Sequence, residues 1–330
     1  MTTQEPLLSV EHFSLSFGGS KTNLIDDISF TVTPGKTLCL VGESGCGKSV
    51  TSLALMGLLA KGAARITQGE ANFDGQNLFA LPERSRADLR GNDMAMIFQE
   101  PMTSLNPSMT IGRQIVEGIR RHKAVSAEDA EARALEMLSL VRIPAPEKRF
   151  HAYPHQLSGG MRQRAMIAMA LANEPRLLIA DEPTTALDVT IQAQILALVS
   201  RLQAETGTAM ILITHDLSVV AEVADDVAVM YAGRIVEMGS VDDIFSDPQH
   251  PYTLGLFGSV PSVGKRSGTL ATIEGSVPPL ELMPRGCRFA TRCPFADERC
   301  FNEVPPNYEP REGHRVACWY APLEEHVSVV

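Results

Sequence analysis

The stretch GESGCGKS, residues 42–49, follows the apolar run TLCLV (residues 37–41) and precedes a predicted helix over residues 50–59. Strand, glycine-rich loop and helix in this order fit the pattern G-x-x-x-x-G-K-[ST] of phosphate-binding loops. Glycines let successive backbone N–H groups turn toward an anion, and the helix N-terminus adds partial positive charge. We therefore expect Lys48 to reach the β- and γ-phosphates of a nucleotide, and the Ser49 hydroxyl to bind Mg²⁺.

A second motif, RLLIADEP at residues 176–183, is an apolar strand that ends in two carboxylates. Asp181 is placed to hold Mg²⁺ through water, as in the Walker B motif. Glu182, one residue later, can polarise an attacking water as a general base. A strand ending in Asp-Glu is weak evidence alone, but together with the phosphate loop it predicts nucleotide hydrolysis.

A third motif, LSGGMRQR at residues 157–164, begins a predicted helix with Ser158 as its N-cap. Here the sequence resembles the ABC ATPases, whose signature is LSGGQ-like. Met161 stands where many members have Gln, and the peptide-importing subfamily often shows GGMRQR. The motifs also follow the family order, with Gln99 in MIFQEP and His215 in LITHD. The resemblance covers roughly residues 7 to 260.

The resemblance implies a nucleotide site that binds ATP and Mg²⁺, with Ser49 and Gln99 as magnesium ligands. The residues expected to bind the nucleotide are Gly42, Ser44, Gly45, Cys46, Gly47, Lys48, Ser49, Val50 and Asp181. Phe17, in the segment SLSF, would stack on the adenine; the alternative is a phenylalanine buried in the core.

The resemblance also assigns roles between subunits. In the family, two ATPase domains meet head to tail, and each ATP lies between the phosphate loop of one and the signature of the other. The signature residues that would contact the partner's γ-phosphate are Ser158, Gly159 and Gly160. Gln99 would sense Mg²⁺ and the attacking water and couple the site to a membrane partner. Asp188 would bridge the two sites, and His215 would hold the γ-phosphate and orient Glu182.

The expected fold is α/β: an ABC-type phosphate-loop ATPase with a RecA-like core and an antiparallel β subdomain. A helical subdomain is expected at about residues 99–165, where the spacing predicts an amphipathic helix over residues 128–141. TVTPGKT and FDGQN carry turn residues that suit the antiparallel strands. The ATPase domain would span residues 1–245 and an irregular cysteine-containing extension residues 246–330, which includes the stretch DPQHPYT.

The charge and hydropathy of this 330-residue chain argue against some classes of protein. A formal net charge of −10 argues against a nucleic-acid binder that relies on a basic surface. The N-terminus does not resemble a signal peptide, and no run of about 20 apolar residues occurs. We expect a chain that does not span a membrane by itself and whose thiols stay reduced.

The C-terminal segment holds four of the six cysteines: Cys287, Cys293, Cys300 and Cys318. Structural zinc usually uses close C-x₂₋₄-C pairs, and none is present; wider spacing suits a bulkier [4Fe–4S] cluster. The importer family carries such a cluster in some members, and these positions resemble that pattern. Zn²⁺, free thiols and a disulfide remain alternatives, and His314 nearby is expected to be a solvated loop residue.

The leading hypothesis is the ATP-hydrolysing subunit of a peptide importer, peripheral at the cytoplasmic face of the bacterial inner membrane. Its expected partners are a second, homologous ATPase subunit, two permease subunits and, indirectly, an extracytoplasmic peptide-binding protein, but no nucleic acid. One alternative is a soluble ABC ATPase of DNA repair or translation. Another is an iron–sulfur regulator that uses ATP binding as a switch, against which the catalytic carboxylate Glu182 weighs.

Overall fold

The computed structural model describes residues 5–20, 22–100, 104–183, 189–258 and 273–323, without the side chains of residues 189–191. Contacts divide the chain into two compact units. The first comprises Met1–Leu7, Val32–Thr37 and Ala80–Ile213, and the second comprises Leu8–Thr31, Leu38–Phe79 and Thr214–Val330. Each unit contains strands and helices, as the α/β prediction requires. Among the helices of the described ranges, none has the length and apolar composition that crossing a membrane demands.

Three parallel strands form the centre of the first unit. β6 (Met94–Ile97) pairs with β7 (Leu177–Asp181), and β7 pairs with β8 (Ala209–Ile213). Every residue of these strands is buried, which is why their sequences are continuous apolar runs rather than alternating ones. The prediction that LLIAD and MILIT form buried parallel strands is confirmed.

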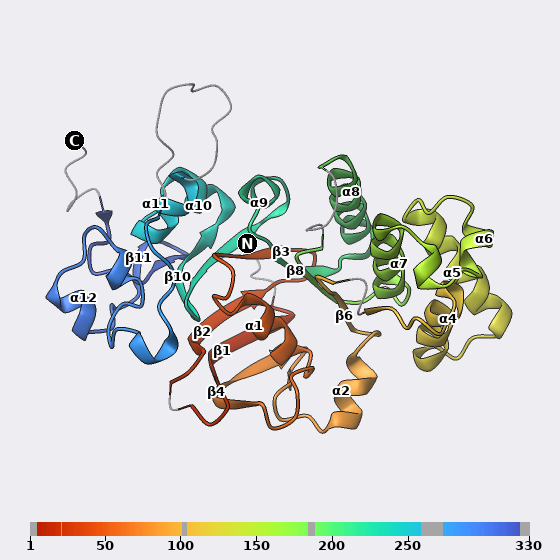
Figure 1. Cartoon of the computed structure of the whole chain (residues 1–330), viewed down its shortest axis with the longest axis horizontal. Coiled ribbons are helices and arrows are strands. Elements are labelled where there is room, and N and C mark those ends of the chain that lie inside the picture. Colours follow the sequence, from red (N-terminus) through yellow and green to blue (C-terminus); the bar gives the residue numbers. More distant parts are fainter. Residues whose placement is uncertain (1–4, 21, 101–103, 184–188, 259–272, 324–330) are drawn as a thin grey trace. The chain divides into compact units, whose positions relative to one another are not determined.

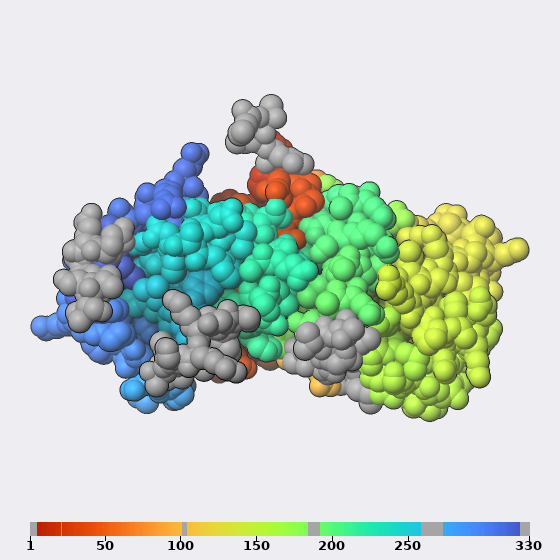
Figure 2. All heavy atoms as spheres, turned by 90° about the horizontal axis from the view of Figure 1, so that it is seen from above, coloured from red at the N-terminus to blue at the C-terminus, as the bar shows by residue number. Residues whose placement is uncertain are grey.

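The described helices of the first unit are, in chain order, α2 (Glu83–Leu89), α4 (Ile111–His122), α5 (Ala127–Leu140), α6 (Pro146–Phe150), the one-turn η1 (Pro154–Gln156), α7 (Gly159–Leu171) and α8 (Val189–Thr206). α4 and α5 each contact the other three of the group α4–α7 (Figure 1), whose atoms, coloured yellow to green, pack closely in Figure 2. α5 confirms the predicted amphipathic helix, capped by Ser126, which accepts a hydrogen bond from the Asp129 N–H at 3.0 Å.

The second unit contains the expected antiparallel sheet, in the order β2-β1-β4-β5. Its strands are β1 (Leu8–Phe17), β2 (Ile25–Val32), β4 (Ala64–Phe73) and β5 (Gln76–Asn77). FDGQN makes the hairpin between β4 and β5, with positive φ at both Asp74 and Gly75, 49° and 78°. Tight hairpins require this conformation, and Asp-Gly adopts it at low cost, so the turn prediction is confirmed.

A second set of strands in this unit joins the C-terminal extension to the phosphate-loop strand. β3 (Thr37–Val41) lies parallel to β9 (Asp226–Tyr231), and β9 is antiparallel to β10 (Arg234–Ser240). β10 then pairs with β12 (His314–Val316), which pairs with β11 (Tyr308–Arg311). The helices that precede residue 259 in the unit are α1 (Lys48–Leu55), α9 (Leu217–Val223), α10 (Val241–Ser246) and α11 (Pro251–Gly258). Strand β12 is therefore an integral part of this ladder, which the sequence did not predict.

Elsewhere the described part of the extension has only short regular elements, as its Pro- and Gly-rich sequence suggests. They are η2 (Leu280–Leu282), η3 (Ala290–Arg292) and α12 (Glu298–Asn302). In Figure 1, α12 and β11 both belong to the blue part of the ribbon.

A buried carboxylate anchors the extension to β10. Glu237 accepts hydrogen bonds from the backbone N–H groups of Gln249 and His250, at 2.7 and 2.9 Å. His314 Nε2 lies 2.9 Å from the same carboxylate, and both side chains are fully buried. The expectation of a solvated loop histidine at position 314 is therefore wrong, because β12 carries the ring into the core. Burial lowers the pKa of His250 to about 4, so its neutral ring accepts the Tyr252 N–H through Nδ1 at 3.0 Å.

Candidate functional site

The phosphate loop occupies the predicted place between β3 and α1 in the second unit. Gly47 has φ 108° and precedes Lys48, the first residue of α1. A Cβ at Gly42 would lie 2.1 Å from the Met230 carbonyl oxygen of β9, and one at Gly47 would lie 2.4 Å from Ile25 Cδ1. Gly42 thus requires glycine because a Cβ would collide with the backbone of β9, and Gly47 requires it because φ 108° strains any other residue.

Lys48 is 5% exposed, and its ammonium group lies inside this loop. The ammonium donates to the carbonyl oxygens of Gly42 and Glu43, at 2.7 and 3.0 Å. These contacts hold a positive charge at the N-terminus of α1, where an anion is favoured. Ser44 and Gly45 are exposed at the loop surface, and Ser49 and Val50 are half-buried in the first turn of the helix. The arrangement suits a bound phosphate group.

Glu43 has two partners that the sequence analysis missed. Its backbone N–H donates to the Tyr252 hydroxyl at 2.8 Å. Its carboxylate accepts two hydrogen bonds from the Arg292 guanidinium, at 2.6 and 3.0 Å. The sequence analysis noted the stretch DPQHPYT, which contains Tyr252, but nothing in that stretch indicates that Tyr252 contacts Glu43.

In the first unit, β7 delivers the two predicted carboxylates. Asp181 is 4% exposed at the end of the strand. Glu182 follows with φ 44°, a conformation that costs a non-glycine residue energy and is concentrated at functional sites. The Glu182 N–H donates to the Ile213 carbonyl at 2.9 Å, and Gln99 Nε2 donates to the Glu182 carboxylate at 3.0 Å. The structure therefore brings Gln99 and Glu182 together, as their expected roles require.

The signature motif begins α7 in the same unit. Ser158 caps the helix by accepting a hydrogen bond from the Met161 N–H at 3.3 Å, which confirms the predicted cap. Ser158 and Gly159 are exposed, and a Cβ at Gly159 would meet no atom within 4 Å. Gln163, 4% exposed, donates through its side chain to the Pro183 carbonyl and so ties α7 to the turn after Glu182. The sequence did not single out Gln163.

The remaining predicted residues lie in the second unit or outside the described ranges. Phe17 is half-buried at the end of β1, opposite Ala64, and is not among the buried core residues. His215 is exposed directly after β8, between Thr214 and the α9 cap Asp216. Asp188 lies outside the residues that the structure describes. Phe17, His215 and the phosphate loop belong to the second unit, whereas the two carboxylates, Gln99 and the signature belong to the first.

The four C-terminal cysteines are all free thiols gathered in one region of the second unit. Burial is the main cause that raises the pKa of each thiol, to about 11 for Cys293 and about 12 for Cys318. Charges on Cys287, Cys293 and Cys300 raise the pKa of Cys318 further, so all four lie within electrostatic reach of one another. Within the described ranges, however, no group of three or more His, Cys, Asp or Glu side chains is placed to hold a metal ion.

Two family models match this chain. The ABC transporter model matches residues 25–185, which include the phosphate loop, the signature and β7. The model of the C-terminal region of oligopeptide/dipeptide transporters matches residues 236–300, which include Tyr252, Arg292 and three of the four C-terminal cysteines. His215, Phe17 and Cys318 lie outside both matched ranges.

Similar proteins extend the match to nearly the whole chain. A probable peptide ABC transporter ATP-binding protein of Sinorhizobium fredii is 54% identical, over 95% of this chain and 94% of that relative. The dipeptide transport ATP-binding protein DppD of Bacillus subtilis is 51% identical, over 96% and 95%. A solved dimeric ATP-binding cassette in a post-hydrolysis state with ADP and Pi is 26% identical, with a TM-score of 0.63, over 71% of this chain and 98% of that chain.

The phosphate-loop cysteine gives a test of this geometry. Cys46 is fully buried, and burial raises the pKa of its thiol more than the nearby Lys48 lowers it. Because only the thiolate reacts, native Cys46 should be alkylated by iodoacetamide at pH 7.5 at least about tenfold more slowly than in urea. The rate in the native chain should rise with pH as the thiolate fraction grows. Peptide mass spectrometry measures the labelling of Cys46. Equal labelling rates in the native and unfolded chains would contradict a buried Cys46 thiol.

Proposed function

This chain belongs to the ABC transporter family, in its branch of oligopeptide and dipeptide transporters, and we propose that it is the ATP-hydrolysing subunit of a membrane importer for peptides or related solutes. The observation that carries the proposal is the phosphate loop, in which Gly42 packs against strand β9 and the Lys48 ammonium is held among the loop carbonyls at the N-terminus of α1. The peptide transport named for the similar proteins supports this over a soluble ATPase of DNA repair or translation.

ATP is proposed to bind with its phosphates on the loop from Gly42 to Val50, held by backbone N–H groups and Lys48. Phe17, half-exposed at the end of β1, is the proposed adenine-stacking residue. Mg²⁺, which prefers oxygen ligands, is proposed to bind the Ser49 hydroxyl, the Gln99 amide oxygen and, through water, Asp181. When bound, Mg²⁺ would neutralise negative charge on the phosphates.

Hydrolysis is assigned to Glu182, which accepts the proton of water as the water oxygen attacks the γ-phosphorus and the bond to ADP breaks. The Gln99 amide N–H donates to the Glu182 carboxylate and so helps to fix its orientation. His215 is proposed to hold the γ-phosphate and to orient Glu182. A charged acceptor at the end of a rigid strand is what a general base requires.

The catalytic assembly is proposed to need a second, homologous ATPase subunit. The exposed Ser158 and Gly159, with Gly160, would contact the γ-phosphate bound there, and Asp188 would bridge the two sites. Two permease subunits, served by an extracytoplasmic peptide-binding protein, would receive the motion at the cytoplasmic face of the bacterial inner membrane. We assign residues 1–245 to the ATPase domain and residues 246–330 to the extension.

The four C-terminal cysteines are proposed to hold a [4Fe–4S] cluster, with Zn²⁺ as the alternative. The gathering of Cys287, Cys293, Cys300 and Cys318 within electrostatic reach supports a shared ligand. The spacing of the four cysteines, which contains no close C-x₂₋₄-C pair, favours the larger cluster over zinc. A bound cluster would supply folding free energy to an extension with few regular elements.

Replacing the proposed base tests the hydrolytic function. Glu182→Gln keeps the shape of the side chain but cannot accept a proton, so ATP hydrolysis by the assembled transporter should fall by roughly 10²–10⁴-fold while ATP still binds. The matched control is Glu205→Gln, an exposed glutamate of the same unit, which should hydrolyse ATP normally. Near-normal turnover of Glu182→Gln would remove Glu182 from its proposed role.

Metal analysis tests the cluster. Protein purified without oxygen should contain about four irons and four sulfides per chain. Cys293→Ser should lose most of the iron, whereas Cys39→Ala, which alters a buried thiol of β3 far from the C-terminal segment in sequence, should keep it. One zinc without iron would favour the alternative, and the absence of both metals would reject a metal site at these cysteines.

A further inference from the structure

A guanidinium group of the C-terminal extension contacts the side chain of Glu43 in the phosphate loop. Arg292 Nη1 and Nη2 donate to the two carboxylate oxygens of Glu43, at 2.6 and 3.0 Å. The Arg292 side chain is 5% exposed and that of Glu43 is 29% exposed. A bidentate and largely buried ion pair of this kind is stronger and more directional than an exposed ion pair. Arg292 immediately precedes Cys293.

The guanidinium of Arg292 is held on its other side by fixed carbonyl groups. Nε donates to the Glu274 carbonyl at 2.9 Å, and Nη2 donates to the carbonyls of Ile273 and Gly275, at 3.3 and 3.2 Å. The group therefore faces Glu43 before any ligand arrives. Little side-chain freedom remains to be lost when the loop closes on a phosphate.

An aromatic cluster packs these contacts together. Tyr252, whose hydroxyl accepts the Glu43 N–H, lies with its ring centroid 4.8 Å from that of Tyr231 and 5.3 Å from that of Phe289. Phe289 is 2% exposed and belongs to the cysteine-bearing segment. The Glu43 backbone and side chain are thus both held by residues beyond position 250 in the sequence.

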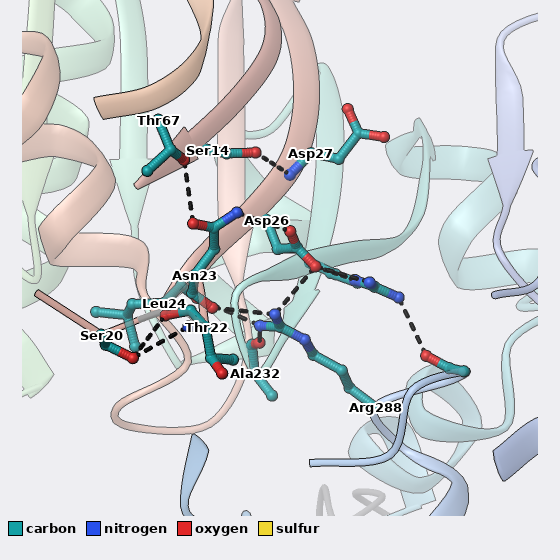
Figure 3. Close-up of polar contacts among 12 residues, drawn as sticks. Ser14, Ser20, Thr22, Asn23, Leu24, Asp26, Asp27, Thr67, Ala232 and Arg288 are labelled. Carbon is teal, nitrogen blue, oxygen red and sulfur yellow. Dashed lines mark hydrogen bonds and ion pairs between the residues drawn. The ribbon is translucent and has the colours of Figure 1, made fainter. Parts of the chain in front are cut away.

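A second arginine of the segment holds the turn before β2. Arg288 is 5% exposed and donates to the carbonyls of Asn23 and Leu24, at 3.0 and 3.4 Å (Figure 3). It also pairs with Asp26 at 3.0 Å, where Arg234 is a second partner at 2.7 Å. Ile25, the first residue of β2, directly follows this turn and lies against Gly47, so Arg288 supports the phosphate loop through β2.

We propose that the segment from residue 287 to residue 293 is a structural part of the nucleotide site, with Arg292 and Arg288 as positioning residues. Arg292 has a further electrostatic role. Glu43 places a negative charge in a loop that must receive the phosphates of ATP, and Arg292 neutralises that charge. This inference rests on the proposal that the loop binds ATP.

The charge argument predicts an asymmetry between the two partners of the ion pair. Arg292→Ala leaves the Glu43 carboxylate uncompensated, so the Kd for Mg²⁺-ATP should rise about tenfold in the full-length chain. Glu43→Gln removes the negative charge of the carboxylate, so the Kd of this variant for Mg²⁺-ATP should stay within about threefold of that of the unmodified chain. The double variant Arg292→Ala/Glu43→Gln should recover most of the lost affinity. A merely structural role would give equal losses in both single variants and no recovery.

Control variants distinguish a failure of this inference from a failure of the proposed function. Arg299→Ala alters a 53% exposed arginine of the same extension, which stacks on Trp319, and should bind ATP like the unmodified chain. Lys48→Ala should abolish the binding of ATP. If the unmodified chain itself did not bind ATP, the proposed function would be wrong. Normal binding by Arg292→Ala, or equal losses in Arg292→Ala and Glu43→Gln, would overturn the inference alone. If Arg292→Ala does not fold, Arg292→Gln takes its place, because it also removes the positive charge and should therefore raise the Kd about tenfold.

Discussion

The close approach of the phosphate loop to strand β9 constrains the rest of the second unit. No side chain fits at Gly42, because a Cβ there would lie 2.1 Å from the Met230 carbonyl oxygen. The loop is therefore fixed to β9, and β9 pairs in turn with β10, which carries β12 of the extension. A chain built in this way cannot move its C-terminal extension without affecting the strands that hold the phosphate loop.

Local sequence patterns predicted the features that neighbouring residues determine. The phosphate loop, the buried strands β7 and β8, the Ser158 cap and the Asp-Gly hairpin each follow from residues within one short segment. The ties that the sequence did not predict join distant positions: Arg292 and Glu43 are 249 residues apart, and His314 and Glu237 are 77 apart. Nothing in the spacing of either residue identifies its partner, since tertiary packing alone brings the two together.

Two proposals for the extension support each other. A cluster on the four cysteines would stabilise the segment that bears Arg288 and Arg292, because these arginines directly follow Cys287 and directly precede Cys293. Loss of the cluster would then loosen the ion pair at Glu43 and weaken ATP binding. The extension would thereby make nucleotide affinity depend on the integrity of a site that takes no part in hydrolysis.

Hydrogen–deuterium exchange on the full-length chain, with and without Mg²⁺-ATP, tests most directly whether the extension belongs to the nucleotide site. The phosphate loop, residues 42–49, and the segment 287–293 should both exchange more slowly when ATP is bound, because Arg292 and Tyr252 connect them. Slower exchange in the loop alone, with residues 287–293 unchanged, would contradict this account.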